Sequence, residues 1–298
     1  EIPKGVTVSV QGASVRVNDV SGTAPSGGSV DIALDVAGNV YALWRDERDG
    51  DDDIYFAMRP VGGSWGVNVK VNDDMGAAEQ ASPAIAVDPV GNVYAVWVDQ
   101  RNDEGDIYFA MCPSGGNWGT NVRVNGDPGE PQTAPDIAVD DSGNAYAVWS
   151  ADHRNIYFAA RTAGGAWSTS ARVNDDLTDT WRGAPAITVD WDGNAYTVWE
   201  DSRNLNQDLF FAYRAAISTT WSANLQANDA GWVSRPDIAM DADGNAHAVW
   251  EDERNGNPDI YFSTGALGVG WDANTRVDDD GSGTAKQKRS DIALDSSN

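Results

Sequence analysis

The chain has almost no cysteine, since Cys112 is the single one among 298 residues. An intramolecular disulfide and a cysteine-based zinc site are therefore both excluded. Long apolar runs are missing as well, and no stretch approaches the roughly 18 residues that a membrane-spanning helix needs. We therefore expect no membrane insertion. Apolar segments with the 3.6-residue period of a helix are also absent.

Basic residues are scarce. Lys and Arg number 20 against 46 Asp and Glu, which gives a formal net charge of -26, and only four of the bases are lysines. Such a surface repels nucleic acid, so no nucleic-acid partner is expected. Oxygen-rich acidic loops can bind Ca²⁺, but none here has EF-hand spacing. We predict no cofactor, with Ca²⁺ at the acidic loops as the alternative. The acidic clusters are Asp51–Asp53, Asp73–Asp74, Asp175–Asp176 and Asp278–Asp280.

A short apolar segment that ends in aspartate recurs six times, at intervals of 53, 52, 50, 51 and 54 residues. After each of the first five copies comes a turn that ends in Gly-Asn, where glycine can take the left-handed conformation of a tight hairpin. The recurring aspartates are Asp35, Asp88, Asp140, Asp190, Asp241 and Asp295.

Each of the five complete repeats reads as four short strands, which we call A to D. In the first copy, strand A is followed by an alternating strand that ends at Trp44, by the segment 54–57 with its Tyr-Phe pair, and by residues 67–73. Four antiparallel strands in about fifty residues are typical of a β-propeller blade. Stacked blades bury each other's faces, so the repeated aromatic residues are expected between blades.

These repeats predict one all-β domain over residues 1–298, a six-bladed β-propeller of four-stranded antiparallel blades. The sixth blade is expected to be built from both termini, with no strand B accounted for. Five blades are predicted at about 30–73, 82–125, 134–175, 184–229 and 235–279, and the sixth at 5–19 together with 290–298.

The C–D turns carry a family resemblance. Gly62-Gly63-Ser64-Trp65 and its copies resemble the tail of the Asp-box, Ser-x-Asp-x-Gly-x-x-Trp, of sialidase-like propellers, also called the bacterial neuraminidase repeat. The Ser and Asp of the box are lost, so these are degenerate copies. The resemblance implies a propeller from an extracellular or cell-surface bacterial protein. It implies no activity, because the box is structural in that family and the family's Arg-Ile-Pro segment has no match here. No catalytic residue is therefore predicted.

The B–C loops repeat the sequence Asp-x-Arg, as Asp46/Arg48, Asp99/Arg101, Asp152/Arg154, Asp201/Arg203 and Asp252/Arg254. Arginine and carboxylate pair through two hydrogen bonds and can pin a loop. Because every repeat has the pair, we interpret it as structural. The alternative is a multivalent lectin with one site in each blade.

In this strand order the D–A and B–C loops share one face, where propellers usually bind their ligands. Several residues that depart from the repeat collect there, and these are the predicted ligand-binding residues. Exposed tryptophan offers a stacking surface for sugar rings, and arginine offers paired donors. The competing interpretation is that the tryptophans plug loops and the bases offset nearby acids. The predicted residues are Trp181, Arg182, Trp232, Arg235, Arg289 and His153.

We therefore expect a monomeric, non-catalytic binding module that recognises a glycan or a protein at the D–A/B–C face. A sialidase-like glycoside hydrolase is the first alternative, and it requires carboxylates that converge at the propeller axis. A structural spacer domain is the second. The candidate carboxylates for a hydrolase are Glu79, Glu130, Asp179, Asp136 and Asp237.

Overall fold

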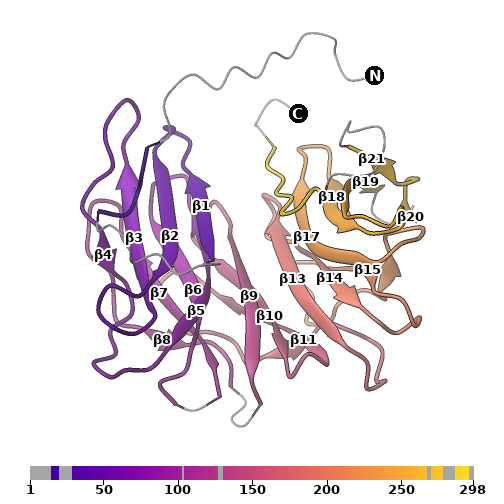
Figure 1. The fold of residues 1–298 in the computed structure, drawn as a ribbon, viewed down its shortest axis with the longest axis horizontal. Helices are drawn as coiled ribbons and strands as arrows, with labels where there is room; N and C mark the ends of the chain where they lie inside the picture. Colours follow the sequence, from indigo (N-terminus) through magenta and orange to yellow (C-terminus); the bar gives the residue numbers. More distant parts are fainter. Residues whose placement is uncertain are drawn as a thin grey trace.

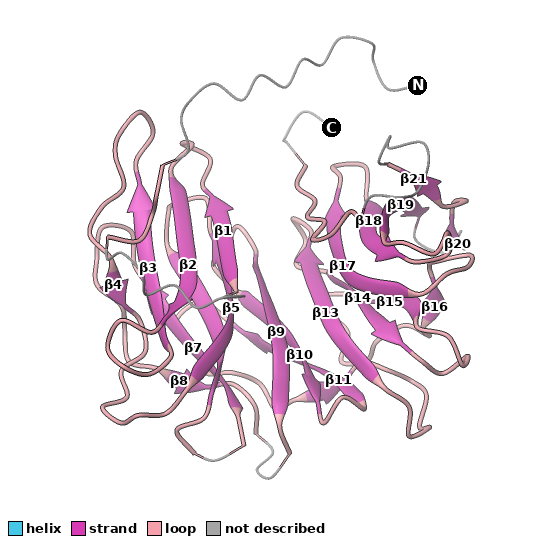
Figure 2. Ribbon diagram, in the orientation of Figure 1, coloured by secondary structure: helices cyan, strands magenta, loops and turns pink. Residues whose placement is uncertain are grey.

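The structure, a computed structural model, describes residues 15–19, 29–102, 104–126, 130–266, 270–277 and 286–294. Every regular element in these residues is a β-strand (Figure 2). The strands form five antiparallel sheets, and within each sheet they lie side by side in chain order. We call these sheets blades 1 to 5 (Figure 1). The all-β prediction is confirmed for the described part of the chain.

The first strand of each blade contacts the first strand of the next blade and lies innermost. These inner strands are β1 (Val30–Leu34), β5 (Gln80–Val87), β9 (Gln132–Val139), β13 (Arg182–Val189) and β17 (Val233–Met240). The second strands are β2 (Val40–Asp46), β6 (Val93–Asp99), β10 (Ala145–Ala151), β14 (Ala195–Asp201) and β18 (Asn245–Asp252). The third strands are β3 (Asp53–Arg59), β7 (Asp106–Cys112), β11 (Asn155–Arg161), β15 (Asp208–Arg214) and β19 (Asp259–Ala266).

The outer strands are short. They are β4 (Val69–Lys70), β8 (Val122–Arg123), β12 (Ala171–Arg172), β16 (Leu225–Gln226) and β21 (Thr275–Arg276). Blade 5 has one further short strand, β20 (Gly270–Trp271), which also pairs with β19.

One aspartate organises the turn between the first and second strands of each blade. In blade 1, Asp35 accepts hydrogen bonds from the backbone N–H groups of Ala37 and Asn39 and from the hydroxyl of Tyr41, at 2.8–3.0 Å. Gly38 has a φ of +84° in this turn, a conformation that costs glycine little. The predicted hairpins are therefore present. Equivalent networks surround Asp88, Asp140, Asp190 and Asp241.

Large apolar side chains fill the joints between blades. One cluster joins Leu43 and Ile54 of blade 1 to Trp97 of blade 2. In blades 2 to 5, the tryptophan of the C–D turn meets a phenylalanine of the preceding blade edge to face, as Trp118 meets Phe56 with ring centroids 5.2 Å apart. This confirms that the repeated aromatic residues form the core. The second-strand tryptophans with 0–1% exposure are Trp97, Trp149, Trp199 and Trp250.

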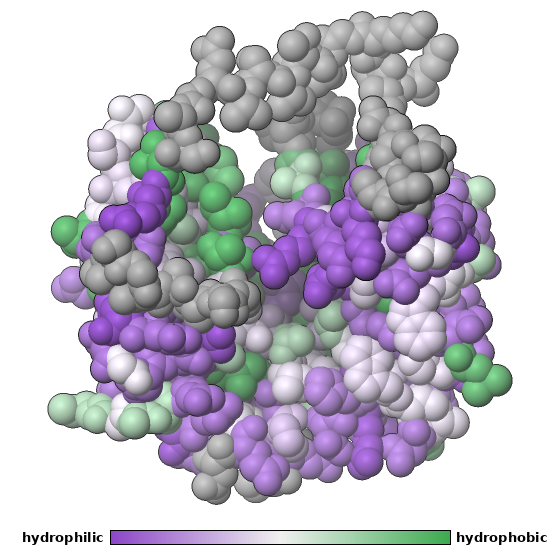
Figure 3. Space-filling view, in the orientation of Figure 1, coloured by the Kyte–Doolittle hydropathy of each residue, from purple (hydrophilic) through white to green (hydrophobic). Residues whose placement is uncertain are grey.

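Blade 1 stands at one end of the row of blades, and its inner strand is less covered than the others. Ile32 is 50% exposed, and apolar side chains remain visible over β1 (Figure 3). The equivalent isoleucines of the other blades are only 4–6% exposed, because each lies in a joint between two blades. They are Ile85, Ile137, Ile187 and Ile238.

The other end of the row carries the C-terminal described residues. Residues 290–294 form no strand, and neither do residues 15–19. Residues 5–14 and 295–298, also assigned to the sixth blade, lie outside the described residues, as do Asp278–Asp280. The count of six blades therefore stays a prediction.

Residues 290–294 nevertheless lie beside β17 as a following inner strand would. The backbone N–H of Ile292 donates to Asp237 at 2.8 Å. The same bond joins consecutive blades elsewhere, from Ile187 to Asp136 at 2.7 Å.

Four inner strands share an irregularity near their start. The pairing register with the second strand shifts there, and the residue before a proline has a φ between 43° and 49°. Such values are uncommon for residues other than glycine, and a bulge of this kind redirects the backbone groups around it. The four residues are Ser82, Ala134, Ala184 and Arg235.

Candidate functional site

The D–A and B–C loops lie on one face of the molecule, as the strand order predicts. Arg182 at the start of β13 pairs with Asp201 at the end of β14, which pairs with Asp208 at the start of β15. We call this face the upper face. The opposite face, which carries the A–B turns, is the lower face.

Trp181 and Trp232 occupy equivalent positions on neighbouring blades. Each comes directly before an inner strand, and the carbonyl oxygen of each accepts a hydrogen bond from the following B–C loop, at 3.0 and 3.1 Å. Trp181 is 40% exposed and Trp232 is 50% exposed. Blades 2 and 3 have Glu79 and Pro131 at this position. Blades 4 and 5 thus each present an indole at the upper face.

His153 lies beside Trp181. Their rings stack with centroids 6.0 Å apart and an interplanar angle of 13°. The indole also lies close over Gly183, where a Cβ atom would come within 2.8 Å of the ring. The structure therefore brings together two of the predicted site residues, one from the B–C loop of blade 3 and one from the loop that leads into blade 4.

Arg182 does not face solvent. Its side chain is 0% exposed, and its guanidinium donates to Asp201 at 2.8 Å, to Asp176 at 2.6 Å and to the carbonyl oxygen of Arg154 at 2.6 Å. These bonds tie the D–A loop to the blade. Arg182 is thus a structural residue of the upper face, and its donors are engaged within the protein.

Four of the five Asp-x-Arg pairs confirm the structural interpretation. In each, a fully buried aspartate binds arginine at 2.7 Å. The pair in blade 3 is different, and its prediction as an equivalent copy was wrong. Arg154 is 56% exposed and binds Asp152 at 2.9 Å and Asp179 at 2.7 Å. The shorter loop shifts the motif by one residue, so Ala151 stands where the other blades have the buried aspartate.

Two buried glutamates lie next to the predicted arginines. Glu200 and Glu251 follow the second-strand tryptophans of blades 4 and 5 and are 4% and 2% exposed. Glu200 accepts the backbone N–H of Arg235 at 2.6 Å, and Glu251 accepts the backbone N–H of Arg289 at 2.6 Å. The Arg235 guanidinium, itself half exposed, also binds Glu251 at 2.8 Å. The structure thus places the backbone N–H groups of Arg235 and Arg289 on carboxylates of the preceding blade.

The two glutamates differ in their surroundings. Burial raises the pKa of Glu200 to about 7, against hydrogen bonds from Arg235 and Gln207 that lower it. Glu251 instead has a guanidinium directly on its carboxylate. Sequence reasoning missed both residues. A comparison of the position after each second-strand tryptophan would have found them, because it holds Arg45, Val98, Ser150, Glu200 and Glu251 in turn.

The carboxylates that the sequence singled out do not form one cluster. Glu79, Glu130 and Asp179 are exposed on three successive D–A loops. Asp136 and Asp237 lie on the inner strands β9 and β17 and are partly buried, and burial raises the pKa of Asp136 to about 7. Burial also raises the pKa of Asp237, and a hydrogen bond with Asp291 adds to the effect.

Within the described residues, the acidic clusters are largely paired with basic side chains. Asp73 binds Arg101 at 2.7 Å, and Asp175 binds Arg203 at 2.9 Å. Within the described residues, no group of three or more His, Cys, Asp or Glu side chains is arranged to hold a metal ion. The same part of the chain contains no helix that could cross a membrane.

No family model matches the chain, and no curated protein sequence does. Similar solved structures exist. A BP39L lectin from Burkholderia pseudomallei is 9% identical, with a TM-score of 0.66 over 87% of this chain and 72% of the lectin. An α-L-arabinanase from Penicillium chrysogenum, complexed with arabinobiose, is 14% identical, with a TM-score of 0.60 over 85% and 83%. An α-L-arabinofuranosidase from Fusarium graminearum is 14% identical, with a TM-score of 0.61 over 82% and 79%. The likeness shows that this chain has a β-propeller fold.

Proposed function

We propose that this protein binds a carbohydrate on the upper face of blades 4 and 5. The observation that carries the proposal is the pair Trp181 and Trp232, which occupy equivalent positions on neighbouring blades and are 40% and 50% exposed. A partly exposed indole offers a flat apolar surface to a sugar ring. Arg235 and Arg289 lie on the same face and offer donors to hydroxyl or carboxylate groups.

The comparisons support this class of ligand. The similar propellers include a lectin and two enzymes named for arabinose-containing substrates. At 9–14% identity the likeness itself extends only to the fold. The first ligands to test for binding are therefore arabinobiose and the members of a broad glycan array.

Titration calorimetry on the Trp232→Ala variant tests the proposal. We expect at least a tenfold loss of affinity for the bound glycan, with an unchanged melting temperature because the indole is half exposed. Leu205→Ala is the control, since Leu205 is a 94% exposed apolar residue in the B–C loop of blade 4. The absence of binding across the array, or equal binding by Trp181→Ala, Trp232→Ala and the parent protein, would contradict the proposal.

A second candidate function is glycoside hydrolysis by the carboxyl groups of Glu200 and Glu251. The observation that favours it is their unequal environment, since one carboxyl has a raised pKa and the other is held by Arg235. In such a pair, the carboxyl group with the raised pKa can act as the general acid, while the other remains an ionised carboxylate. However, each glutamate is buried and already caps a backbone N–H, which accounts for its presence without catalysis.

Turnover of aryl glycosides separates the two functions. A hydrolase would release the aryl group from an arabinofuranoside or a sialoside and lose this activity in Glu200→Gln. A binding module would show no release with any member of the panel.

We also propose that residues 290–294 occupy the inner-strand position of a sixth blade. The bond from Ile292 to Asp237 supports this, because the same bond joins blade 3 to blade 4. In that case the amide of Ile292 exchanges with solvent as slowly as that of Ile187. Rapid exchange at Ile292 would argue against a sixth blade.

A further inference from the structure

In four blades, one arginine covers the aromatic ring near the start of the third strand. The guanidinium lies 4.0–4.2 Å from the ring centroid, and the rings are only 5–7% exposed. Such stacking of a cation on a ring is favourable. The pairs are Arg48 with Tyr55, Arg101 with Tyr108, Arg203 with Phe210 and Arg254 with Tyr261.

Each of these arginines has the same three side-chain acceptors. Arg101, for example, binds the buried Asp99 at 2.7 Å, Asn121 of its own blade at 3.0 Å and Asp73 of the preceding blade at 2.7 Å. The other three arginines have equivalent bonds. The whole set is therefore one repeated unit of the upper face.

Blade 3 has lost this unit as a whole. Ala151 replaces the buried aspartate, Ser170 replaces the asparagine, and Gly126 replaces the aspartate of the preceding blade. The shortened loop supplies no arginine at the repeat position. The aromatic ring remains as Tyr157, which stacks on Trp149 and is partly exposed, whereas the four equivalent rings are 5–7% exposed.

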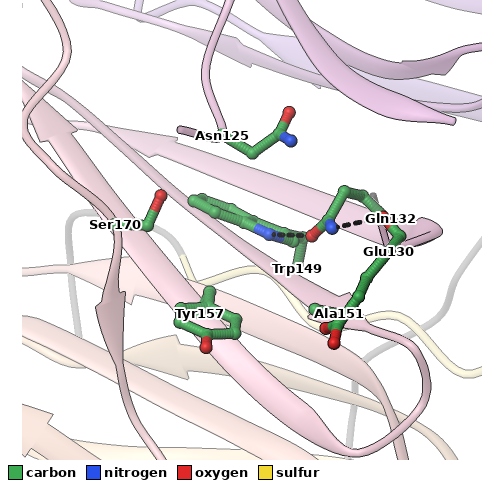
Figure 4. Close-up of a pocket in the computed structure, with 7 residues that line it drawn as sticks. All are labelled: Asn125, Glu130, Gln132, Trp149, Ala151, Tyr157 and Ser170. Carbon is green, nitrogen blue, oxygen red and sulfur yellow. Dashed lines mark hydrogen bonds between the residues drawn. The ribbon is translucent and has the colours of Figure 1, made fainter. Parts of the chain in front are cut away.

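A cavity of about 330 Å³ lies at this place, between blades 2 and 3. Figure 4 shows the Trp149 indole in its wall, with Tyr157 and Glu130 to either side. The indole N–H donates to Gln132 at 2.7 Å, where the other blades use the buried aspartate. Gln132 in turn donates to the carbonyl oxygen of Glu130 at 2.6 Å. The wall is thus held by its own hydrogen bonds.

We propose that this cavity binds one sugar ring of a glycan, with an apolar face of the ring on Tyr157 and hydroxyl groups on the Glu130 carboxylate. The volume falls in the range of small-molecule sites. The combination of an aromatic surface with amide, hydroxyl and carboxylate groups suits a neutral, polyhydroxylated ligand. The proposal rests on the proposed carbohydrate specificity of the protein, but not on the site at Trp181 and Trp232.

An arginine side chain from another molecule fits the cavity less well. The three side chains that hold arginine in the other blades are replaced here by Ala151, Ser170 and Gly126, none of which carries a charge. Among the described residues that line the cavity, Glu130 is the one with a charge. Among these described residues, a guanidinium would therefore find one carboxylate to replace its hydration.

Saturation-transfer NMR with methyl glycosides tests the proposal. The probes are methyl α-L-arabinofuranoside, methyl β-D-xylopyranoside and methyl β-D-galactopyranoside, each titrated to saturation, with L-arginine methyl ester as the cationic probe. The protein is the Trp181→Ala/Trp232→Ala variant, which removes the other proposed site. We expect saturable binding of at least one glycoside, and at least a tenfold weaker dissociation constant in Glu130→Gln.

Matched variants in blade 2 provide the controls. Tyr157→Ala should abolish binding, whereas Tyr108→Ala, which removes a ring already covered by Arg101, should leave it unchanged. Glu79→Gln makes the change of Glu130→Gln on an exposed loop of blade 2 and should also have no effect. Glu130 is itself exposed, so Glu130→Gln remains informative if Tyr157→Ala fails to fold.

Three results would overturn the proposal: no glycoside saturates, Glu130→Gln binds as the parent does, or only L-arginine methyl ester binds. The last would identify a cation site. If the glycosides bind the Trp181→Ala/Trp232→Ala variant and the wild-type protein with equal affinity, the cavity binds them independently of Trp181 and Trp232. Loss of all glycoside binding in the Trp181→Ala/Trp232→Ala protein, with arabinobiose binding intact in wild type, would refute the cavity while sparing the proposed function.

Discussion

The lower and upper faces of this propeller follow the repeat to very different degrees. On the lower face, all five A–B turns use one aspartate in the same way, with a glycine φ of 76–85°. On the upper face, the position before the inner strand holds Glu79, Pro131, Trp181 and Trp232 in blades 2 to 5.

This difference separates structural from functional candidates. The residues of a turn that every hairpin needs cannot vary without a loss of stability. A residue at a loop position with few packing contacts can vary without such a loss. The repeated features of the upper face, such as the Asp99–Arg101 pair, behave like those of the lower face. The residues worth testing for binding are therefore those that leave the repeat, and stability measurements can show where this division fails.

The largest effect is expected from the repeated arginine of the upper face. Arg101→Ala leaves the fully buried Asp99 without its cation, and loss of one partner of a buried pair costs about 3–5 kcal/mol. Arg154→Ala removes an arginine of the same sequence motif that is 56% exposed, so we expect about 1 kcal/mol or less. Urea denaturation of both variants measures the difference. Equal losses would show that Arg154 belongs to the structural set.

The sequence predicted this division only in part. The turns, the aromatic joints and four Asp-x-Arg pairs could be predicted because each depends on residues close in the chain and is repeated. Arg182 could not be placed, because its burial depends on Asp176 and Asp201 from two blades. The shift at Asp152 was missed because the loop length, rather than the motif, decides which residue reaches the buried position.

A somewhat smaller effect is expected on the lower face. Asp190→Ala removes the acceptor for Asn194 and for the hydroxyl of Tyr196, which are bonded at 2.7–2.9 Å. Tyr196 is 2% exposed, and leaving a buried donor without its acceptor costs about 1–3 kcal/mol. Asp192→Ala, in the same turn, changes an exposed side chain and should cost a few tenths of a kcal/mol. Thermal denaturation compares the two, and an equal loss would mean that the network is not what stabilises the turn.

The inner strands between the two faces give the stability a pH dependence. The pKa of Asp136 is raised by burial to about 7, above its ordinary value of 3.8. The folded state therefore binds more protons than the unfolded state between these values, and the stability present at low pH is lost as the pH rises through 7. We expect the free energy of unfolding to be lower at pH 8 than at pH 5 by about 3 kcal/mol.

Asp136→Asn should reduce this pH dependence, because the amide does not ionise. The control is Asp141→Asn, a change in the exposed turn that follows the same strand, which should leave the slope unchanged. The experiment is urea denaturation at several pH values between 5 and 8. A parent protein that gains stability over this range would contradict the assignment.

The smallest effect is expected for Trp191, which tests whether residues of the lower face bind ligands. This residue departs from the repeat on the lower face, is 72% exposed and lines a cavity of about 520 Å³ together with Arg161 and Arg214. If the upper face alone binds glycans, Trp191→Ala changes neither the stability by more than about 0.5 kcal/mol nor the affinity for any glycan that Trp232→Ala weakens. Calorimetric titration of the two variants with the same glycan measures this. A matching loss in Trp191→Ala would show that departure from the repeat marks binding on both faces.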